Sequence, residues 1–240
     1  MKYFELRCTA YIKKDIPFKS SFEILSKYIS FSMTQTEKFK TLHNREGFKH
    51  YSFGNFYPIE RKQVYRKGNS YTFTLRSLDE TFINELSSTL RQNIDNPNFL
   101  VVETYKKIIK QFFISELYSV TPVIVSVGNG LYWSIDKDGD ILKLQKQLNY
   151  NLEKKYHSFY GEPIKGVQNF IQLLEIKNRY PQSIYMKKSA KEIRFFGNKF
   201  RIVPNEDEIS QKLAFLALGC GLGEKNSFGG GFCIAKGLRL

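Results

Sequence analysis

The chain has 240 residues, 42% of them hydrophobic, which suits one large or two small globular domains. Its 37 lysines and arginines exceed its 23 aspartates and glutamates, and the formal charge of +14 favours a polyanionic partner, with solubility alone as the alternative. No apolar run is long enough to span a membrane, and Glu5 and Arg7 interrupt the apolar N-terminus, which argues against a signal peptide. We therefore expect a cytoplasmic protein that does not enter a membrane.

Five segments of the first half predict a ferredoxin-like domain. In chain order they are a strand (2–13), a helix (20–36), a hairpin (50–58 and 70–78), a helix (78–93) and an extended segment (98–118). This β-α-β-β-α-β order is also used by RNA-recognition modules, whose sheet leaves one face open to RNA.

The second half repeats this pattern with decorations. It offers a strand (123–135), a helix (140–161), extended segments (169–181 and 182–204) and a final helix, loop and strand. No Pro/Gly/Ser linker separates the halves, so we expect them to pack rigidly. The predicted fold class is α+β: two tandem ferredoxin-like (RRM-like) domains, residues 1–118 and 119–240, with a C-terminal glycine-rich loop.

The cysteines and histidines do not indicate a metal site. The three cysteines are too few and too scattered for a disulfide framework, and they form no C-x-x-C motif. The three histidines have none of the spacings typical of zinc ligands. We expect no metal and no cofactor.

Residues 219–232, GCGLGEKNSFGGGF, hold six of the chain's 16 glycines. Glycine permits positive φ and lets another backbone or a ligand come very close. A dinucleotide fingerprint does not fit, because Glu224 stands at its last glycine position and the helix precedes the strand; no Walker A motif is present either. A tight structural turn and a nest of N–H groups for a phosphate backbone both remain open.

Tandem ferredoxin-like domains that end in G-L-G-E-K-N-S-F-G-G-G-F resemble the CRISPR-associated endoribonucleases of the RAMP superfamily, which cut precursor CRISPR RNA within its repeats. The superfamily's loop has a small-hydrophobic-small core, a basic middle and a final G-x-G. Here these parts are Gly221-Leu222-Gly223, Lys225 and Gly229-Gly230-Gly231. The family usually has a bulky residue where this chain has Gly230, and this departure predicts a more flexible loop.

The resemblance implies a metal-independent reaction in which a ribose 2′-OH attacks its own adjacent phosphate, leaving a 2′,3′-cyclic phosphate and a 5′-OH. Family members with a catalytic triad place a tyrosine in the first helix, then a histidine, then a lysine. Tyr28, His43 and Lys49 match that order. On this reading His43 transfers a proton, Lys49 stabilises the developing charge, and Tyr28 acts on the opposite side. His50 is an alternative histidine, and Tyr28 is alternatively a core residue.

We expect RNA to bind at the glycine-rich loop and at basic surfaces. The 15 tyrosines and 21 phenylalanines interleaved with basic residues suit single-stranded RNA, because bases stack on rings while cations hold phosphates. The candidates in the loop are Gly221, Gly223, Lys225, Asn226, Ser227, Gly229 and Gly231. Those in a predicted basic hairpin are Lys187, Lys188, Lys191, Arg194, Lys199 and Arg201, for which a solvated surface is the alternative.

The resemblance implies CRISPR repeat RNA, in the precursor transcript, as the partner. Transfer of the product to a CRISPR interference complex and a homodimer are further options. Two alternatives to the nuclease stay open. One is a non-catalytic RAMP protein that binds repeat RNA or guide RNA in an effector complex, and the other is an unrelated basic RNA-binding protein.

Overall fold

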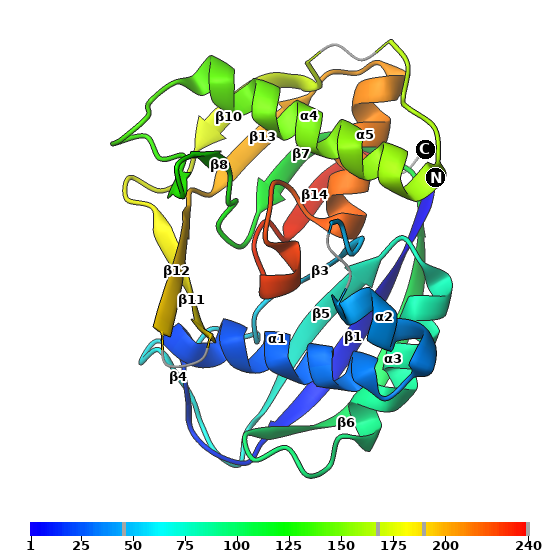
Figure 1. Ribbon diagram of the computed structural model, residues 1–240, viewed down its shortest axis with the longest axis vertical. Coiled ribbons are helices and arrows are strands. Elements are labelled where there is room, and N and C mark those ends of the chain that lie inside the picture. Colours follow the sequence, from blue (N-terminus) through cyan, green and yellow to red (C-terminus); the bar gives the residue numbers. More distant parts are fainter. Residues whose placement is uncertain (45–46, 167–168, 189–190, 239–240) are drawn as a thin grey trace.

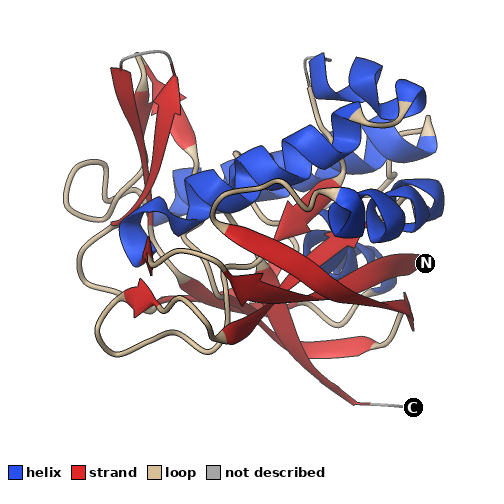
Figure 2. Ribbon diagram, turned by 90° about the horizontal axis from the view of Figure 1, so that it is seen from below, coloured by secondary structure: helices blue, strands red, loops and turns tan. Residues whose placement is uncertain are grey.

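The structure, a computed structural model, describes residues 1–44, 47–166, 169–188 and 191–238. Its two main sheets each have four antiparallel strands, with helices packed on one face (Figure 1, Figure 2). Within the described ranges no helix is long and apolar enough to cross a membrane.

The first domain has the predicted ferredoxin-like order. Its elements are β1 (Lys2–Ile12), α1 (Phe18–Thr34), β3 (Tyr51–Phe53), β5 (Ser70–Ser77), α3 (Glu80–Gln92) and β6 (Phe99–Lys110). The sheet order is β3-β5-β1-β6. Alternate residues of β1, namely Phe4, Leu6 and Cys8, are buried in the core that α1 and α3 share, as the two-residue period of a strand requires. Short elements α2 (Glu37–Asn44), β2 (Ile16–Pro17) and β4 (Val64–Tyr65) are added to this core fold.

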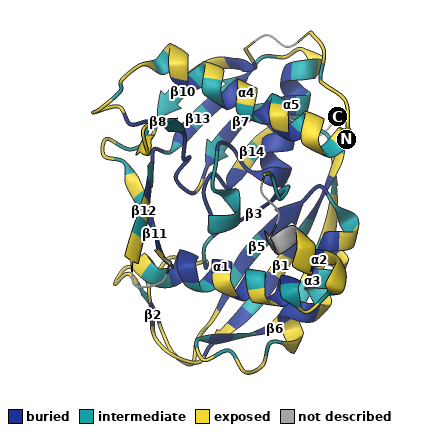
Figure 3. Ribbon diagram, in the orientation of Figure 1, coloured by how far each residue is buried: buried dark blue, intermediate teal, exposed yellow. Residues whose placement is uncertain are grey.

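The second domain repeats the same topology. Its elements are β7 (Phe113–Ser119), α4 (Ile141–Tyr160), β10 (Ile171–Ile176), β13 (Phe200–Pro204), α5 (Glu208–Cys220) and β14 (Cys233–Leu238). The sheet order is β10-β13-β7-β14, which is equivalent to that of the first domain. Helix α5 is buried along nearly all its length and contacts strands of both sheets (Figure 3). The tandem ferredoxin-like prediction is therefore confirmed.

The structure differs from the sequence prediction at one domain boundary and at one strand. Strand β7 pairs with β13 and β14, so the domains meet between Lys110 and Phe113 rather than after residue 118. Residues 123–135 do not supply a strand of the second sheet. They form only a small hairpin, β8 (Ser126–Gly128) and β9 (Leu131–Tyr132), because Asn129 and Gly130 adopt positive φ and turn the chain.

A second hairpin, β11 (Gln182–Lys188) and β12 (Lys191–Gly197), extends from the second domain to the first (Figure 1). Its apolar side chains Ile184, Met186 and Phe195 are buried in the core of the first domain. The N–H group of Lys187 donates to the carboxylate of Glu23 on α1. The hairpin therefore links the two domains.

Arg76 on β5 also connects the two domains. Its guanidinium donates to the Glu5 carboxylate at 2.8 Å and to the carbonyls of Cys233 and Leu218 at 2.6 and 3.4 Å. The guanidinium also lies 4.6 Å from the ring centroid of Phe232. A buried charge is costly unless it is paired, and here the carboxylate of the first domain and the carbonyls of the second domain pair it, so Arg76 links the two domains.

Candidate active site

A cavity of about 350 Å³ lies where the two domains meet. The first domain contributes residues 47–50, which precede β3, and Tyr51, the first residue of that strand. The second domain contributes Lys155 from α4, Cys220 from α5, and residues 224–228 of the glycine-rich loop. The cavity brings a histidine, several lysines and the loop into one place.

The glycine-rich loop winds back on itself after α5. It includes a short 3₁₀ turn, Asn226–Phe228, that begins after Lys225 in left-handed conformation. The space beside Gly223 is filled by the Ile124 carbonyl, 2.6 Å from where a Cβ would lie, and the space beside Gly229 is filled by the Phe22 ring. The glycines at these two positions are thus required by contacts within the protein.

Asn226 was predicted to contact RNA, but its side chain points into the loop. Its amide nitrogen donates to the carbonyls of Leu222 and Gly230 at 3.2 and 2.9 Å. Its amide oxygen accepts from the Lys155 ammonium at 2.8 Å. Because both ends of the amide are used internally, Asn226 shapes the loop rather than offering a donor to phosphate.

Lys225 and Ser227 lie on the accessible part of the loop and line the cavity. The Lys225 ammonium lies 5.5 Å from the ring centroid of Phe195 on the basic hairpin. The backbone carbonyl of Ser227 accepts a hydrogen bond from Ser26 of α1 at 2.9 Å. The loop is therefore anchored to the first domain and to the hairpin.

Lys49 and His50 line the same cavity from the opposite side. Burial lowers the pKa of Lys49 below its ordinary value. His50 has a φ of 50°, its Nε2 lies 3.1 Å from the Ser158 hydroxyl of α4, and its ring packs edge-on against Phe159. An ordered histidine and a partly desolvated lysine thus lie beside the glycine-rich loop.

The predicted triad is only partly placed at this cavity. His43 belongs to the last turn of α2, and its side chain lies outside the described part of the structure. Tyr28 is 1% exposed, stacks near Phe99, and donates its hydroxyl to the Leu90 carbonyl at 2.6 Å. Tyr28 is therefore a core residue, the alternative to a catalytic role, because its hydroxyl is buried and already has an acceptor.

The structure contains the predicted hairpin, but the basic residues predicted there differ in exposure and in their partners. Lys187 and Lys191 are exposed, and the exposed Arg194 lies 4.4 Å from the ring centroid of Phe196. The side chain of Lys188 lies outside the described residues. Arg201 belongs to β13 and is ion-paired with Glu116 and Glu175. The sequence did not predict these two ion pairs.

Lys199 lies at the turn between β12 and β13 and faces a separate groove. This groove, of about 650 Å³, runs between the start of α1, strand β11 and residues 120–122. Burial lowers the pKa of Lys199. Lys19 and Tyr185 line the same groove, and the Lys19 ammonium lies 4.2 Å from the Tyr185 ring centroid.

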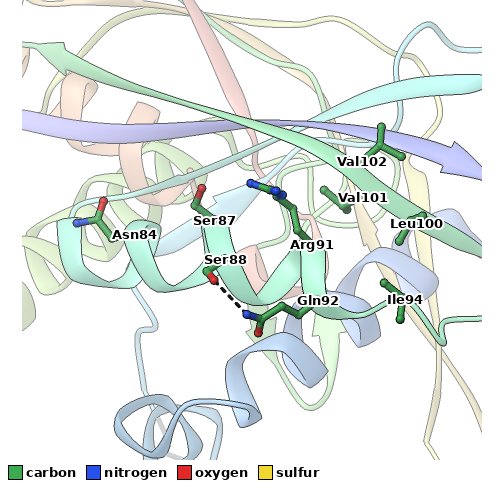
Figure 4. A pocket seen from close by; sticks show the side chains of 9 residues that line it. All are labelled: Asn84, Ser87, Ser88, Arg91, Gln92, Ile94, Leu100, Val101 and Val102. Carbon is green, nitrogen blue, oxygen red and sulfur yellow. Dashed lines mark hydrogen bonds between the residues drawn. The ribbon is translucent and has the colours of Figure 1, made fainter.

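A third hollow, of about 620 Å³, lies on the first domain between α3 and β6 (Figure 4). Arg91 is the one charged side chain among the residues that line it, beside serines, amides and aliphatic groups. It shares no lining residue with the junction cavity. We therefore take the junction cavity, with its lysines and histidine, as the candidate active site.

In the part of the chain that the structure describes, no three His, Cys, Asp or Glu residues are grouped as metal ligands.

Sequence inspection missed Lys155 on α4. Leu144, Leu148 and Leu152 are buried at a spacing of four residues, and Lys155 follows three residues later on the same face. A lysine that continues an apolar stripe is a signal of a buried, hydrogen-bonded cation.

Comparisons with known proteins agree with this fold. A family model described as "CRISPR associated protein Cas6, C-terminal" matches residues 103–234. The chain is 26% identical over 228 residues to the "CRISPR-associated endoribonuclease Cas6 2" of Methanocaldococcus jannaschii, a match that covers 88% of this chain and 92% of the relative.

Two solved structures share the whole architecture. One, titled "CRISPR associated protein Cas6", has a TM-score of 0.67 at 21% identity and covers 98% of this chain and 99% of its own. The other, titled "An RAMP protein binding different RNA substrates", has a TM-score of 0.67 at 18% identity, with coverage of 97% and 99%. Both likenesses extend over the two ferredoxin-like domains.

Proposed function

Because the matching model spans more than half of the chain, this protein belongs to the Cas6 family, and we propose that it is an endoribonuclease that binds CRISPR repeat RNA and cleaves the precursor transcript within repeats. The observation that carries this proposal is the junction cavity, where Lys49 and His50 of one domain lie across from Lys225 and Ser227 of the other. The similarity to an archaeal Cas6 endoribonuclease supports it.

The proposed reaction needs no metal. The 2′-oxygen forms a bond to the adjacent phosphorus, the bond from phosphorus to the 5′-oxygen breaks, and the products are a 2′,3′-cyclic phosphate and a 5′-OH. A base must take the 2′-OH proton, an acid must protonate the leaving 5′-oxygen, and a positive charge must face the phosphate oxygens.

We assign the electrostatic role to Lys49 and the proton transfer to a histidine. An imidazole with an ordinary pKa of about 6.5 serves as base or acid near neutral pH. His43, from the resemblance, and His50, from its position in the cavity, are both candidates. We do not retain Tyr28, because its buried hydroxyl would have to leave the Leu90 carbonyl to reach RNA.

The decisive experiment is cleavage of a labelled repeat RNA in EDTA. We expect the wild type to cut, a 2′-deoxy substitution at the scissile nucleotide to block cutting, and Lys49→Ala to reduce the rate. His43→Ala and His50→Ala identify the histidine, with His157→Ala as the matched control because His157 is exposed on α4 and does not line the cavity. Cleavage of the 2′-deoxy RNA, or cleavage abolished by EDTA, would contradict the mechanism.

The core position of Tyr28 favours a second candidate function. Because Tyr28 does not line the cavity, the predicted triad is not assembled there, and the chain would then be a non-catalytic family member that binds repeat RNA and does not cut it. This candidate predicts tight, repeat-selective binding with intact RNA after long incubation. An unrelated RNA-binding protein would bind a scrambled RNA equally well.

For RNA binding we propose the loop residues Lys225 and Ser227 together with the exposed hairpin residues Lys187, Lys191 and Arg194. The stack of Phe195 on Phe228, with ring centroids 5.5 Å apart, joins the hairpin to the loop. RNA that follows the hairpin would therefore be led toward the junction cavity.

A further inference from the structure

Lys155 is a buried cation with an unusual set of partners. Its side chain is on α4, and the residue is 2% exposed. Its ammonium donates to the carbonyls of Gly221 and Gly223, each at 2.7 Å, and to the amide oxygen of Asn226 at 2.8 Å. An ammonium has three protons, so its hydrogen-bonding capacity is filled by three acceptors of one loop.

These acceptors are all neutral. Among the described residues no carboxylate lies within ion-pair distance of Lys155. Burial lowers the pKa of its ammonium. A buried charge is costly unless it is paired, and Lys155 has hydrogen bonds but no ion-pair partner. We therefore looked for a role of this charge beyond stability.

The position of Lys155 suggests that role. It lies at the floor of the junction cavity, and its ammonium is 5.9 Å from the ring centroid of Phe48 in the segment that carries Lys49 and His50. By binding three oxygens of the loop, it draws their negative ends toward α4 and away from an incoming phosphate. It also leaves one positive charge beneath the cavity.

We propose that Lys155 is a positioning residue for the RNA phosphate: it fixes the glycine-rich loop against α4 so that the loop and Lys49 present a cationic surface at the junction cavity. This inference rests on the proposed function for its consequence in cleavage. Its effect on the loop itself can be measured without any cleavage.

Three substitutions separate the roles of Lys155. Lys155→Met removes the donors and the charge but keeps an unbranched side chain, Lys155→Gln keeps a shorter donor without charge, and Lys146→Met removes an exposed lysine from the same helix as the matched control. Lys155→Met removes a buried charge but leaves three loop oxygens without their donor, so we expect a lower melting temperature than in the wild type; cleavage and digestion are therefore compared at a temperature at which thermal unfolding shows every variant to be folded.

In single-turnover cleavage at saturating enzyme, we expect Lys155→Met to lose about 100-fold in rate, because a misplaced catalytic geometry has an effect of that size. Lys155→Gln should lose less, and Lys146→Met should match the wild type. A rate for Lys155→Met within threefold of the wild type, in a protein that is folded, would overturn the proposal.

The salt dependence of binding to repeat RNA distinguishes positioning from direct contact. Each phosphate contact to a single strand contributes about 0.7 to the slope of log affinity against log salt. Lys225→Met should lower that slope by about this amount, and adding Lys155→Met to it should lower the slope no further, because a positioning residue acts on phosphate through the loop that carries Lys225. A double variant whose slope falls by a further 0.7 or so would show direct phosphate contact by Lys155 and refute a positioning role.

Limited trypsin digestion tests the loop without RNA. Lys225 lies in the anchored loop, so we expect wild-type protein and Lys146→Met to resist cutting after Lys225, and Lys155→Met to be cut faster there. Equal cutting in all three would contradict the inference. If the wild type never cleaves RNA but Lys155→Met still loosens the loop, the proposed nuclease activity fails while the positioning of the loop stands.

Discussion

The ring of Phe22 on α1 occupies the space in which a Cβ atom on Gly229 would lie. Gly229 also has a φ of 90°, in the left-handed region. The first domain and the loop of the second domain thus approach each other at a position that excludes a side chain. The sequence predicted that glycine would let another group come very close to the loop, and at this position the close neighbour is a side chain of the first domain.

Gly229→Ala should therefore destabilise the fold. We expect the free energy of unfolding to fall by about 2–4 kcal/mol, from left-handed strain and from overpacking against Phe22. Gly161→Ala is the matched control, because Gly161 has a φ of 82° with no atom within 4 Å of an added Cβ. Urea titration measures both. An equal loss in the two variants would mean that the Phe22 contact is unimportant.

The same contact limits what valine substitutions in the loop can reveal. A side chain on Gly223 would meet the Ile124 carbonyl, and one on Gly229 would meet Phe22, before any RNA is present. Loss of RNA binding in such variants would reflect a damaged loop. Substitutions of Lys225 and Ser227, whose side chains line the cavity, are the informative ones.

Tyr28→Phe should leave RNA cleavage within about threefold of the wild type, because the hydroxyl is bonded to the Leu90 carbonyl rather than exposed to substrate. The loss of that buried hydrogen bond should lower the free energy of unfolding by about 1 kcal/mol. Single-turnover cleavage and thermal unfolding report the two quantities. A rate loss of tenfold or more at unchanged affinity would restore the tyrosine to the reaction.

The fold was predictable because its signals are local. Helical spacing of apolar residues located α1, α3 and α4, and Gly161 correctly ended α4 in left-handed conformation. The boundary at β7 was not predictable, because an apolar extended segment does not reveal which sheet it joins. Only pairing with β13 and β14, distant in sequence, assigns it to the second domain.

The site was less predictable than the fold, because side-chain partners come from remote segments. Lys225 and Ser227 were expected from the loop motif, and the structure places both at the cavity. Asn226 fits the same motif, but the Leu222 and Gly230 carbonyls hold its amide inside the loop. Lys155 is 66 residues from Gly221, and nothing in the loop motif points to it.

The pH dependence of stability should contain a contribution from Glu116. Hydrogen bonding to the Arg201 guanidinium, followed by bonds from Tyr118 and Lys236, lowers the pKa of Glu116 from 4.5 to about 2. A carboxyl whose pKa is depressed by folding stabilises the fold above its unfolded pKa, and this stabilisation is lost as the pH falls through its folded pKa.

Glu116→Gln should therefore flatten the fall of stability between about pH 4.5 and pH 2. Thermal unfolding in this range measures the effect. Glu206→Gln is the control, since Glu206 is exposed and precedes α5. Identical pH profiles for Glu116→Gln and the wild type would show that the Arg201 pair does not couple to folding.

The exposed lysines of the hairpin should contribute to RNA affinity through charge. Lys187 and Lys191 lie on paired strands β11 and β12, and both are exposed. If each contacts one phosphate, the double variant Lys187→Ala/Lys191→Ala should lower the slope of log affinity against log salt by about 1.4. Affinity should fall most at low salt, and the preference for repeat RNA over scrambled RNA should persist, because phosphate contacts carry no sequence information. The control is Lys146→Ala/Lys165→Ala, which removes the same charge from exposed positions in the second domain outside the hairpin. An equal change in slope for both double variants would mean that the net charge of the protein, rather than the hairpin, sets the salt dependence.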